Sequence, residues 1–261
     1  EYPNKKVGII NLSADKKGQL VDFVIVGSIE EADSLSHYEN VFLFPLIERM
    51  YQSPVPKQHQ HKKQLTIGYH GSYTHLSKFG PHLKNALEEL SQECDFKLKI
   101  ITSNTSFDWK LGKPNVDNVE IIKWNIDNVK ADLLDCDIGV VPNITFLNYE
   151  DLGLEVSTDL GLYNTDYVLR LKNKSNAGRA FVFHQLGIPV VADITPSNLH
   201  ILGNPDCGFA VCSKEGWKKA LLKLQDAETR QFIADNAKRE FDRLYNPQKW
   251  AKRLYNNIME I

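Results

Sequence analysis

Four basic residues lie close together between positions 170 and 179, where a helix is predicted to begin. Lys174 and Arg179 are two of them, and Ser175 or Asn176 is the predicted N-cap, because its side-chain oxygen can accept a hydrogen bond from a free backbone N–H. Cations at a helix N-terminus oppose the helix dipole, which carries about half a positive charge there. A bound diphosphate would remove this conflict. The alternative interpretation is a solvated face, with the lysines pointing away and Arg179 extending to solvent.

A second group of polar residues follows the first strand of the larger predicted sheet. Gly71, Ser72 and Tyr73 come soon after an apolar run at 65–69. A glycine lets the backbone approach a ligand closely, and Ser72 adds a hydroxyl and a backbone donor. The alternative is an ordinary strand-to-helix turn with a capping serine. The residues expected to bind one ligand are therefore Gly71, Ser72, Tyr73, Lys174, Ser175, Asn176 and Arg179.

Acidic and histidine side chains were weighed as metal ligands. Asp135 and Asp137 have the spacing of paired carboxylates, but they precede an apolar strand and so lie at the amino edge of a parallel sheet, opposite the ligand crevice. His59 and His61 fall in a segment without preorganised geometry, and His184 lies in an apolar helix that favours a structural role. We expect no metal ion. No catalytic residue is assigned, since a P-loop, a GxGxxG motif and a Ser-His-Asp order are all missing from the sequence.

The composition of the chain argues against several classes of protein. The chain has 261 residues, of which 42% are apolar and 25% charged, as in folded globular proteins. A net charge of -2 argues against nucleic acid and anionic membrane surfaces as partners. Four scattered cysteines indicate a reducing, cytoplasmic setting, and no apolar run approaches the roughly 18 residues of a spanning helix. Because the chain begins at Glu1, we expect a piece of a longer protein, which could still meet a membrane peripherally through the missing part.

Strands and helices alternate regularly after residue 64. The predicted strands are 65–69, 96–101, 119–122, 138–141, 188–192 and 209–211, and the predicted helices are 80–90, 129–134, 177–186 and three more at the C-terminal end. Gly187 can end a helix in the left-handed conformation, and Pro189 prevents the helix from continuing. Short apolar runs joined by helices predict an α/β fold, a doubly wound, Rossmann-like parallel sheet with its ligand at the carboxyl ends of the strands.

The rest of the chain is divided by composition. Three apolar runs before residue 45 predict strands of a second α/β domain, and polar residues with nothing to bury predict a linker after it. A longer acidic stretch at 144–170 is interpreted as an insertion near the cleft or as a surface loop. The predicted divisions are a domain remnant at 1–56, a linker at 57–64, a ligand-binding domain at 65–246 and a final helix at 247–261.

Several segments resemble one known family. They are 67–72 (Ile-Gly-Tyr-His-Gly-Ser), 136–142 (Cys-Asp-Ile-Gly-Val-Val-Pro) and 186–192 (Leu-Gly-Ile-Pro-Val-Val-Ala), followed by a tryptophan helix at 213–217. Together, residues 64–255 resemble the C-terminal, donor-binding domain of GT-B glycosyltransferases, specifically the retaining group 1 enzymes that use nucleotide-diphosphate sugars. By the same resemblance, 1–56 would be the end of the acceptor-binding domain, and 247–261 would cross back to it.

The resemblance implies transfer of a sugar from a nucleotide-sugar donor to a hydroxyl of a glycan, lipid or polymer, without a cofactor. Much of the acceptor domain would be missing, so this piece alone would transfer little. The family pattern places Lys174 and Arg179 near the diphosphate, but many members have glutamate where this sequence has Lys174 and Val182, which puts the ribose contact in doubt. The alternatives are a non-catalytic nucleotide-sugar-binding relative and a sugar-nucleotide epimerase of the same architecture.

Overall fold

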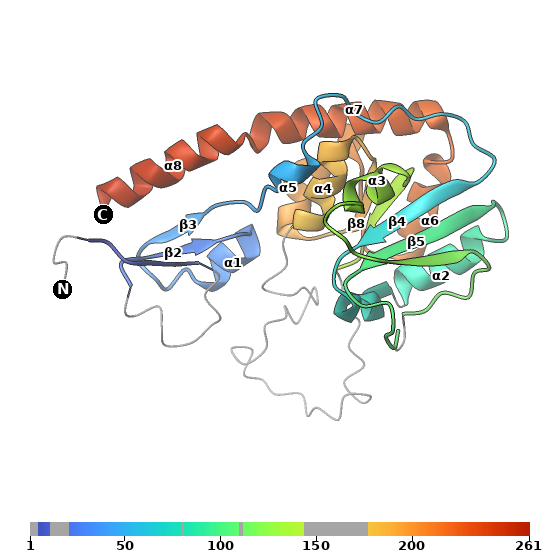
Figure 1. Cartoon of the computed structure of the whole chain (residues 1–261), viewed down its shortest axis with the longest axis horizontal. Coiled ribbons are helices and arrows are strands. Elements are labelled where there is room, and N and C mark those ends of the chain that lie inside the picture. The colour runs from blue at the N-terminus through green and yellow to red at the C-terminus, as the bar shows by residue number, and fades with distance from the viewer. Residues whose placement is uncertain (1–4, 11–20, 80, 110–111, 144–176) are drawn as a thin grey trace.

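The computed structural model describes residues 5–10, 21–79, 81–109, 112–143 and 177–261. These residues form a small and a large parallel sheet that lie apart from each other (Figure 1). The small sheet has the strand order β1-β2-β3, and α1 (Ile29–Ser34) connects its second and third strands. Its strands are β1 (Gly8–Ile10), β2 (Phe23–Val26) and β3 (Val41–Leu43). Val24, Val26 and Leu35 form its buried core.

The large sheet has the strand order β6-β5-β4-β7-β8-β9, and all of its neighbouring strands pair in parallel. Its strands are β4 (Leu65–His70), β5 (Phe96–Thr102), β6 (Val119–Lys123), β7 (Ile138–Val141), β8 (Val190–Asp193) and β9 (Phe209–Val211). The chain builds β4, β5 and β6 outward in one direction, then returns to the other side of β4 to add β7, β8 and β9. This is the order of a Rossmann-like sheet, as the sequence predicts.

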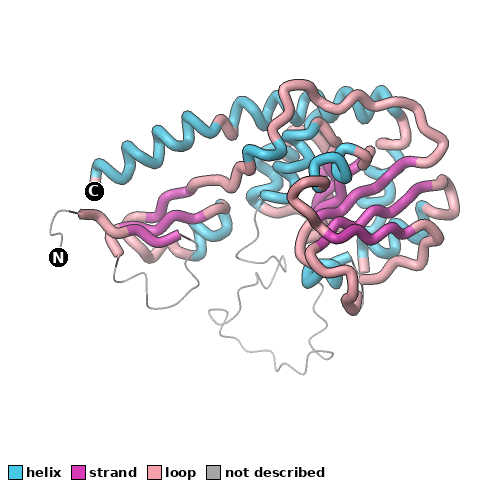
Figure 2. The backbone as a smooth tube through the Cα atoms, viewed as in Figure 1, coloured by secondary structure: helices cyan, strands magenta, loops and turns pink. Residues whose placement is uncertain are grey.

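Helices cover both faces of the large sheet (Figure 2). On one face α2 (His82–Leu90) and α6 (Lys214–Lys223) contribute Leu83, Leu87, Trp217 and Leu221 to one buried cluster. On the other face α3 (Val129–Leu134) and α4 (Gly178–Leu186) contribute to a second cluster. Every residue of β4, β7 and β8 is buried, because each of these strands has a helix layer above and below it.

Helix α4 ends where the sequence predicts. Gly187 adopts φ 72, and the Ile188 N–H donates to the Phe183 carbonyl at 2.9 Å, which closes the last turn. A side chain at position 187 would also strike Pro56, whose Cβ would lie 2.6 Å from the added atom. Glycine is therefore required here both for its backbone conformation and for the close approach of residue 56.

The segment predicted as a linker is packed against the large sheet. The Lys57 and Lys62 ammonium groups donate to Asp137, and the His59 ring lies 2.9 Å from the Gly187 carbonyl. Arg230, which is fully buried in α7, donates to the Gln60 carbonyl at 2.7 Å. None of residues 57–64 is buried, but the segment is anchored through polar contacts with partners that lie far away in the sequence.

Two long helices follow α6 and extend from the large sheet to the small one (Figure 1). They are α7 (Ala227–Leu244) and α8 (Pro247–Glu260). Asn246 caps α8 by accepting from the Lys249 N–H, and the helix reaches β3. The described helices include none that is long and apolar enough to cross a membrane.

Candidate functional site

The switch in strand order places one crevice in the large sheet, at the carboxyl ends of β4 and β7. These strands are neighbours, with Ile67 opposite Ile138, but their chains leave in opposite directions across the sheet. In doubly wound sheets, the crevice at the carboxyl ends of two such strands is the usual place for a ligand. Gly71 follows β4 at this edge, Asn143 follows β7, and α4 begins nearby with Arg179 in its first turn.

The turn at Gly71 approaches α4 closely. Gly71 has φ 143, and a side chain at this position would lie 3.1 Å from the Cδ atom of Arg179 and 3.0 Å from the Tyr69 hydroxyl. The structure thus brings together Gly71 and Arg179, which the sequence assigns to one ligand. The Tyr69 hydroxyl donates to the Ser72 carbonyl at 3.0 Å, so the turn is held by its own strand. Tyr73 begins a short 3-10 helix, η3 (Tyr73–Phe79), and is 37% exposed beside Phe107.

Arg179 lies across the crevice. Its Nη2 atom donates to the Pro142 carbonyl at 3.0 Å and to the Asn143 side-chain oxygen, and its guanidinium lies 5.6 Å from the centre of the Tyr69 ring. Within the part of the chain that the structure describes, its buried Nη1 atom has no hydrogen-bond partner, and neither has the buried Nδ2 atom of Asn143. Two donors, one of them charged, therefore remain unsatisfied side by side.

His70 holds the backbone of Arg179 through a hydrogen bond. Its Nε2 atom lies 3.1 Å from the Arg179 carbonyl, and its ring packs edge-on against Phe183. Burial lowers the pKa of His70 to about 4, so the ring is neutral at pH 7. A carbonyl oxygen can only accept a hydrogen bond, so the Nε2 atom of His70 carries the proton and donates a hydrogen bond to the Arg179 carbonyl. This histidine fixes the first turn of α4 relative to β4.

Asp193 and Asn143 belong to the site but were not predicted. Asp193 ends β8 at the same edge of the sheet and is 3% exposed. Its carboxylate accepts from the Asn143 backbone N–H at 2.7 Å and from the Trp217 indole at 3.1 Å. One signal was present in the sequence, because an aspartate that ends a buried strand at the carboxyl edge has to find donors there.

The remaining predicted residues are Lys174, Ser175 and Asn176, which lie outside the described residues, as does the stretch at 144–170. The N-cap prediction is corrected: α4 begins at Gly178, and Ala177 occupies its N-cap position without a side-chain hydrogen bond. The helix begins later than the polar residues suggest. Of the predicted site, the structure thus places Gly71, Ser72, Tyr73 and Arg179.

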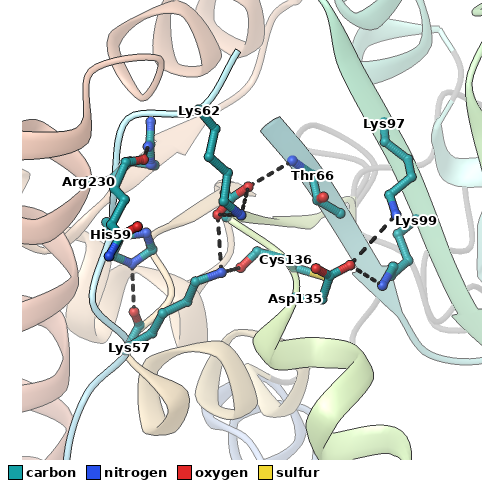
Figure 3. Close-up of polar contacts among 12 residues, drawn as sticks. Lys57, His59, Lys62, Thr66, Lys97, Lys99, Asp135, Cys136 and Arg230 are labelled. Atoms are coloured by element: carbon teal, nitrogen blue, oxygen red, sulfur yellow. Dashed lines mark hydrogen bonds and ion pairs between the residues drawn. The ribbon is translucent and has the colours of Figure 1, made fainter. Parts of the chain in front are cut away.

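At the amino edge of the large sheet, opposite the crevice, Asp135 and Asp137 form ion pairs with lysines (Figure 3). Asp137 is 1% exposed and accepts from Lys57 at 3.1 Å, from Lys62 at 2.8 Å and from the Thr66 N–H at 2.9 Å. Burial would raise the pKa of Asp137, but these hydrogen bonds and the lysine charges outweigh burial and lower it. Asp135 pairs with Lys99. In the described ranges, no three His, Cys, Asp or Glu side chains are placed to hold a metal ion.

Two of the three histidines considered as metal ligands, His59 and His184, pack against other parts of the protein. Burial lowers the pKa of His184 to about 3 and that of His59 to about 4, so both are neutral at pH 7. His184 is 1% exposed inside α4, in agreement with the structural role that its sequence context favours. His59 sits in the packed segment before β4 rather than in a free linker.

No family model and no curated protein matches the chain. Solved structures do. TarM of S. aureus is 13% identical, with a TM-score of 0.64 over 92% of this chain and 44% of TarM. The sucrose-phosphate synthase of Thermosynechococcus elongatus is 15% identical, with a TM-score of 0.59 over 92% of this chain and 59% of the synthase. HepE of Anabaena, solved with UDP and glucose, is 13% identical, with a TM-score of 0.57 over 92% of this chain and 64% of HepE.

The chain has the GT-B fold. The resemblance read from the sequence is therefore confirmed for the fold. At these identities the likeness concerns the fold alone, and the chain spans about half the length of TarM and of the synthase.

Proposed function

We propose that this chain is the donor-binding part of a glycosyltransferase and that its crevice binds the diphosphate of a nucleotide sugar. The observation that carries the proposal is the pair of buried donors, Arg179 Nη1 and Asn143 Nδ2, that have no partner among the described residues and lie at the switch point of the sheet. A buried donor without a partner costs free energy, of the order of 1–3 kcal/mol and more when it is charged. An anion with several acceptor oxygens would satisfy both donors at once.

The surroundings suit a phosphate group. Gly71 gives the backbone close access to Arg179, and the crevice is the usual place for a nucleotide in a doubly wound sheet. HepE and the pneumococcal GtfA were each solved with UDP on the same fold. In transfer, Arg179 would neutralise charge on the departing diphosphate, a role that requires positioning rather than a protein nucleophile. The acceptor would be a hydroxyl of a glycan, lipid or polymer.

Binding tests the proposal directly. Titration calorimetry of the chain with UDP, GDP, CDP, ADP and the matching monophosphates should reveal one preferred diphosphate. Arg179→Ala should weaken its binding at least about tenfold, because a charge-assisted hydrogen bond is lost. Arg239→Ala is the matched control, since it removes the same charge from an exposed position on α7 and should leave affinity unchanged. Equal affinities of the wild type and Arg179→Ala would refute the diphosphate site.

A second candidate, a nucleotide-sugar-binding protein without transferase activity, has one observation in its favour. Val182, which stands where many members of the family have a glutamate, is 1% exposed and packs in the core with Phe183 and Leu186. Valine has no carboxylate with which to bind a ribose. Tight donor binding by the full-length protein with no turnover on any acceptor would favour this candidate, and sugar transfer would exclude it.

A further inference from the structure

The carboxylate of Asp193 accepts hydrogen bonds from two donors in two different elements. One is the backbone N–H of Asn143, at the end of β7, and the other is the indole N–H of Trp217, in α6. The N–H groups of Asn143 and Trp217 can only donate hydrogen bonds, so the side chain at position 193 needs two acceptor atoms. A carboxylate supplies them. An asparagine of the same size would supply one acceptor and would turn its NH2 group toward a second N–H.

Asn143 transmits this constraint to the crevice. Its backbone is held by Asp193, its side-chain oxygen accepts from Arg179 Nη2, and its side-chain nitrogen is one of the two unsatisfied donors. The carboxylate of Asp193 thus fixes the position of Asn143, and Asn143 in turn fixes the position of the Arg179 guanidinium. The chain of contacts runs from β8 through the end of β7 to the first turn of α4.

We infer that Asp193 is a positioning residue of the diphosphate site: it holds Asn143, and through it Arg179, in the geometry that receives the anion. This inference rests on the proposed function. Asp193 does not touch the diphosphate, because its two oxygens face N–H groups within the protein and a carboxylate would repel a phosphate. It acts by preorganising the two donors, so that they do not have to reorient when the anion binds.

If Asp193 had only a structural role, its bond to Trp217 would matter and its bond to Asn143 would not. Variants that affect the two hydrogen bonds differently therefore distinguish a structural role from a positioning role. Trp217 is fully buried, so its bond to Asp193 anchors α6 to the sheet. Trp217→Phe removes this anchor and keeps the bond from Asn143. Asp193→Asn disturbs both bonds. If Asp193 served only the anchoring of α6, the two variants would affect ligand binding alike.

The experiment is a double-mutant cycle read by titration calorimetry, with the preferred nucleoside diphosphate of the wild type and with inorganic pyrophosphate as probes. We expect Asp193→Asn to weaken binding of both probes about tenfold, and Trp217→Phe to change it less than about twofold. In the Arg179→Ala background, Asp193→Asn should weaken binding clearly less than it does in the wild type, because one of the two donors that Asp193 positions is gone. Thermal unfolding of each variant is measured first.

Should Asp193→Asn fail to fold, Asp193→Ser replaces it. A serine hydroxyl is shorter than the carboxylate and cannot hold the Asn143 and Trp217 N–H groups together, so a loss of about tenfold is again expected. Equal weakening by Trp217→Phe and Asp193→Asn would overturn the inference, as would undiminished weakening by Asp193→Asn without Arg179. If Arg179→Ala loses affinity and Asp193→Asn does not, only the role of Asp193 fails. If the wild type binds none of the probes, the proposed function fails as well.

Discussion

At the scale of single residues, the crevice is built from side chains that satisfy each other incompletely. His70, Asn143 and Asp193 each use their hydrogen bonds to hold a neighbour in place, and Arg179 is left with an unsatisfied group. Arg179 and Gly71 could be predicted, because a cation at a helix start and a glycine after a strand are local signals. Asp193 carries a weaker local signal, as an aspartate that ends a buried strand, whereas the role of Asn143 becomes visible only when β7 and β8 lie side by side.

Buried neutral histidines predict a pH dependence of stability. Burial lowers the pKa of His184 to about 3, whereas the unfolded chain titrates near the ordinary value of 6.5. Below pH 6.5 the unfolded state therefore binds a proton that the folded state refuses, so stability falls as the pH drops from 6.5 toward 3. His184→Leu should reduce this slope by up to about 1.4 kcal/mol per pH unit. Urea unfolding between pH 7 and pH 4 measures it.

The pH dependence of the free energy of unfolding is compared between the wild type and His184→Leu. His184 lies in an apolar helix and its Nδ1 atom has no partner in the described part of the chain, so leucine should fit without breaking a hydrogen bond. Curves for the wild type and His184→Leu that stay parallel over this pH range would show that His184 is protonated in the folded state, against its burial.

At the scale of elements, the sequence predicts what depends on local pattern. The strands of the large sheet and the end of α4 follow from apolar runs and from Gly187, and the structure confirms them. The anchoring of the segment at 57–64 could not be predicted, for a physical reason. Its lysines looked solvated because their partner Asp137 lies 75 residues from Lys62 and 80 from Lys57 in the sequence, and only the folded sheet brings the three together.

Asp137 should therefore stabilise the fold by fastening this segment to β7. Asp137→Asn leaves Lys57 half-buried beside a neutral side chain, and we expect a loss of about 3 kcal/mol in the free energy of unfolding. Glu240→Gln is the control, because its ion pair with Arg243 lies at the surface, where Arg243 is 65% exposed, and should contribute less than about 1 kcal/mol. Urea denaturation of the two variants gives both values. Equal losses would mean that burial of Asp137 adds nothing to its ion pairs.

At the scale of the whole molecule, the two sheets are connected by a contact at the same edge as the crevice. Glu30 in α1 of the small sheet is 8% exposed, and its carboxylate accepts from the backbone N–H of Ser197 at 3.1 Å and from the Ser197 hydroxyl. Ser197 lies in α5 (Pro196–Leu202), which follows β8 and Asp193. The connection after β8 therefore contacts the crevice at its start and the small sheet a few residues later.

Removal of this contact should loosen the small sheet while the large sheet stays intact. In Glu30→Ala, the Ser197 N–H and hydroxyl lose their acceptor, so hydrogen exchange should become faster in α1 and around Ser197 and remain unchanged in β4 and β7. Asp33→Ala is the matched control: it removes a carboxylate from the same helix, at an exposed position. If both variants exchange alike, the sheets are held together by the packing of α8 on β3 rather than by Glu30. If only Glu30→Ala loosens, one carboxylate sets how firmly the small sheet is held beside the crevice.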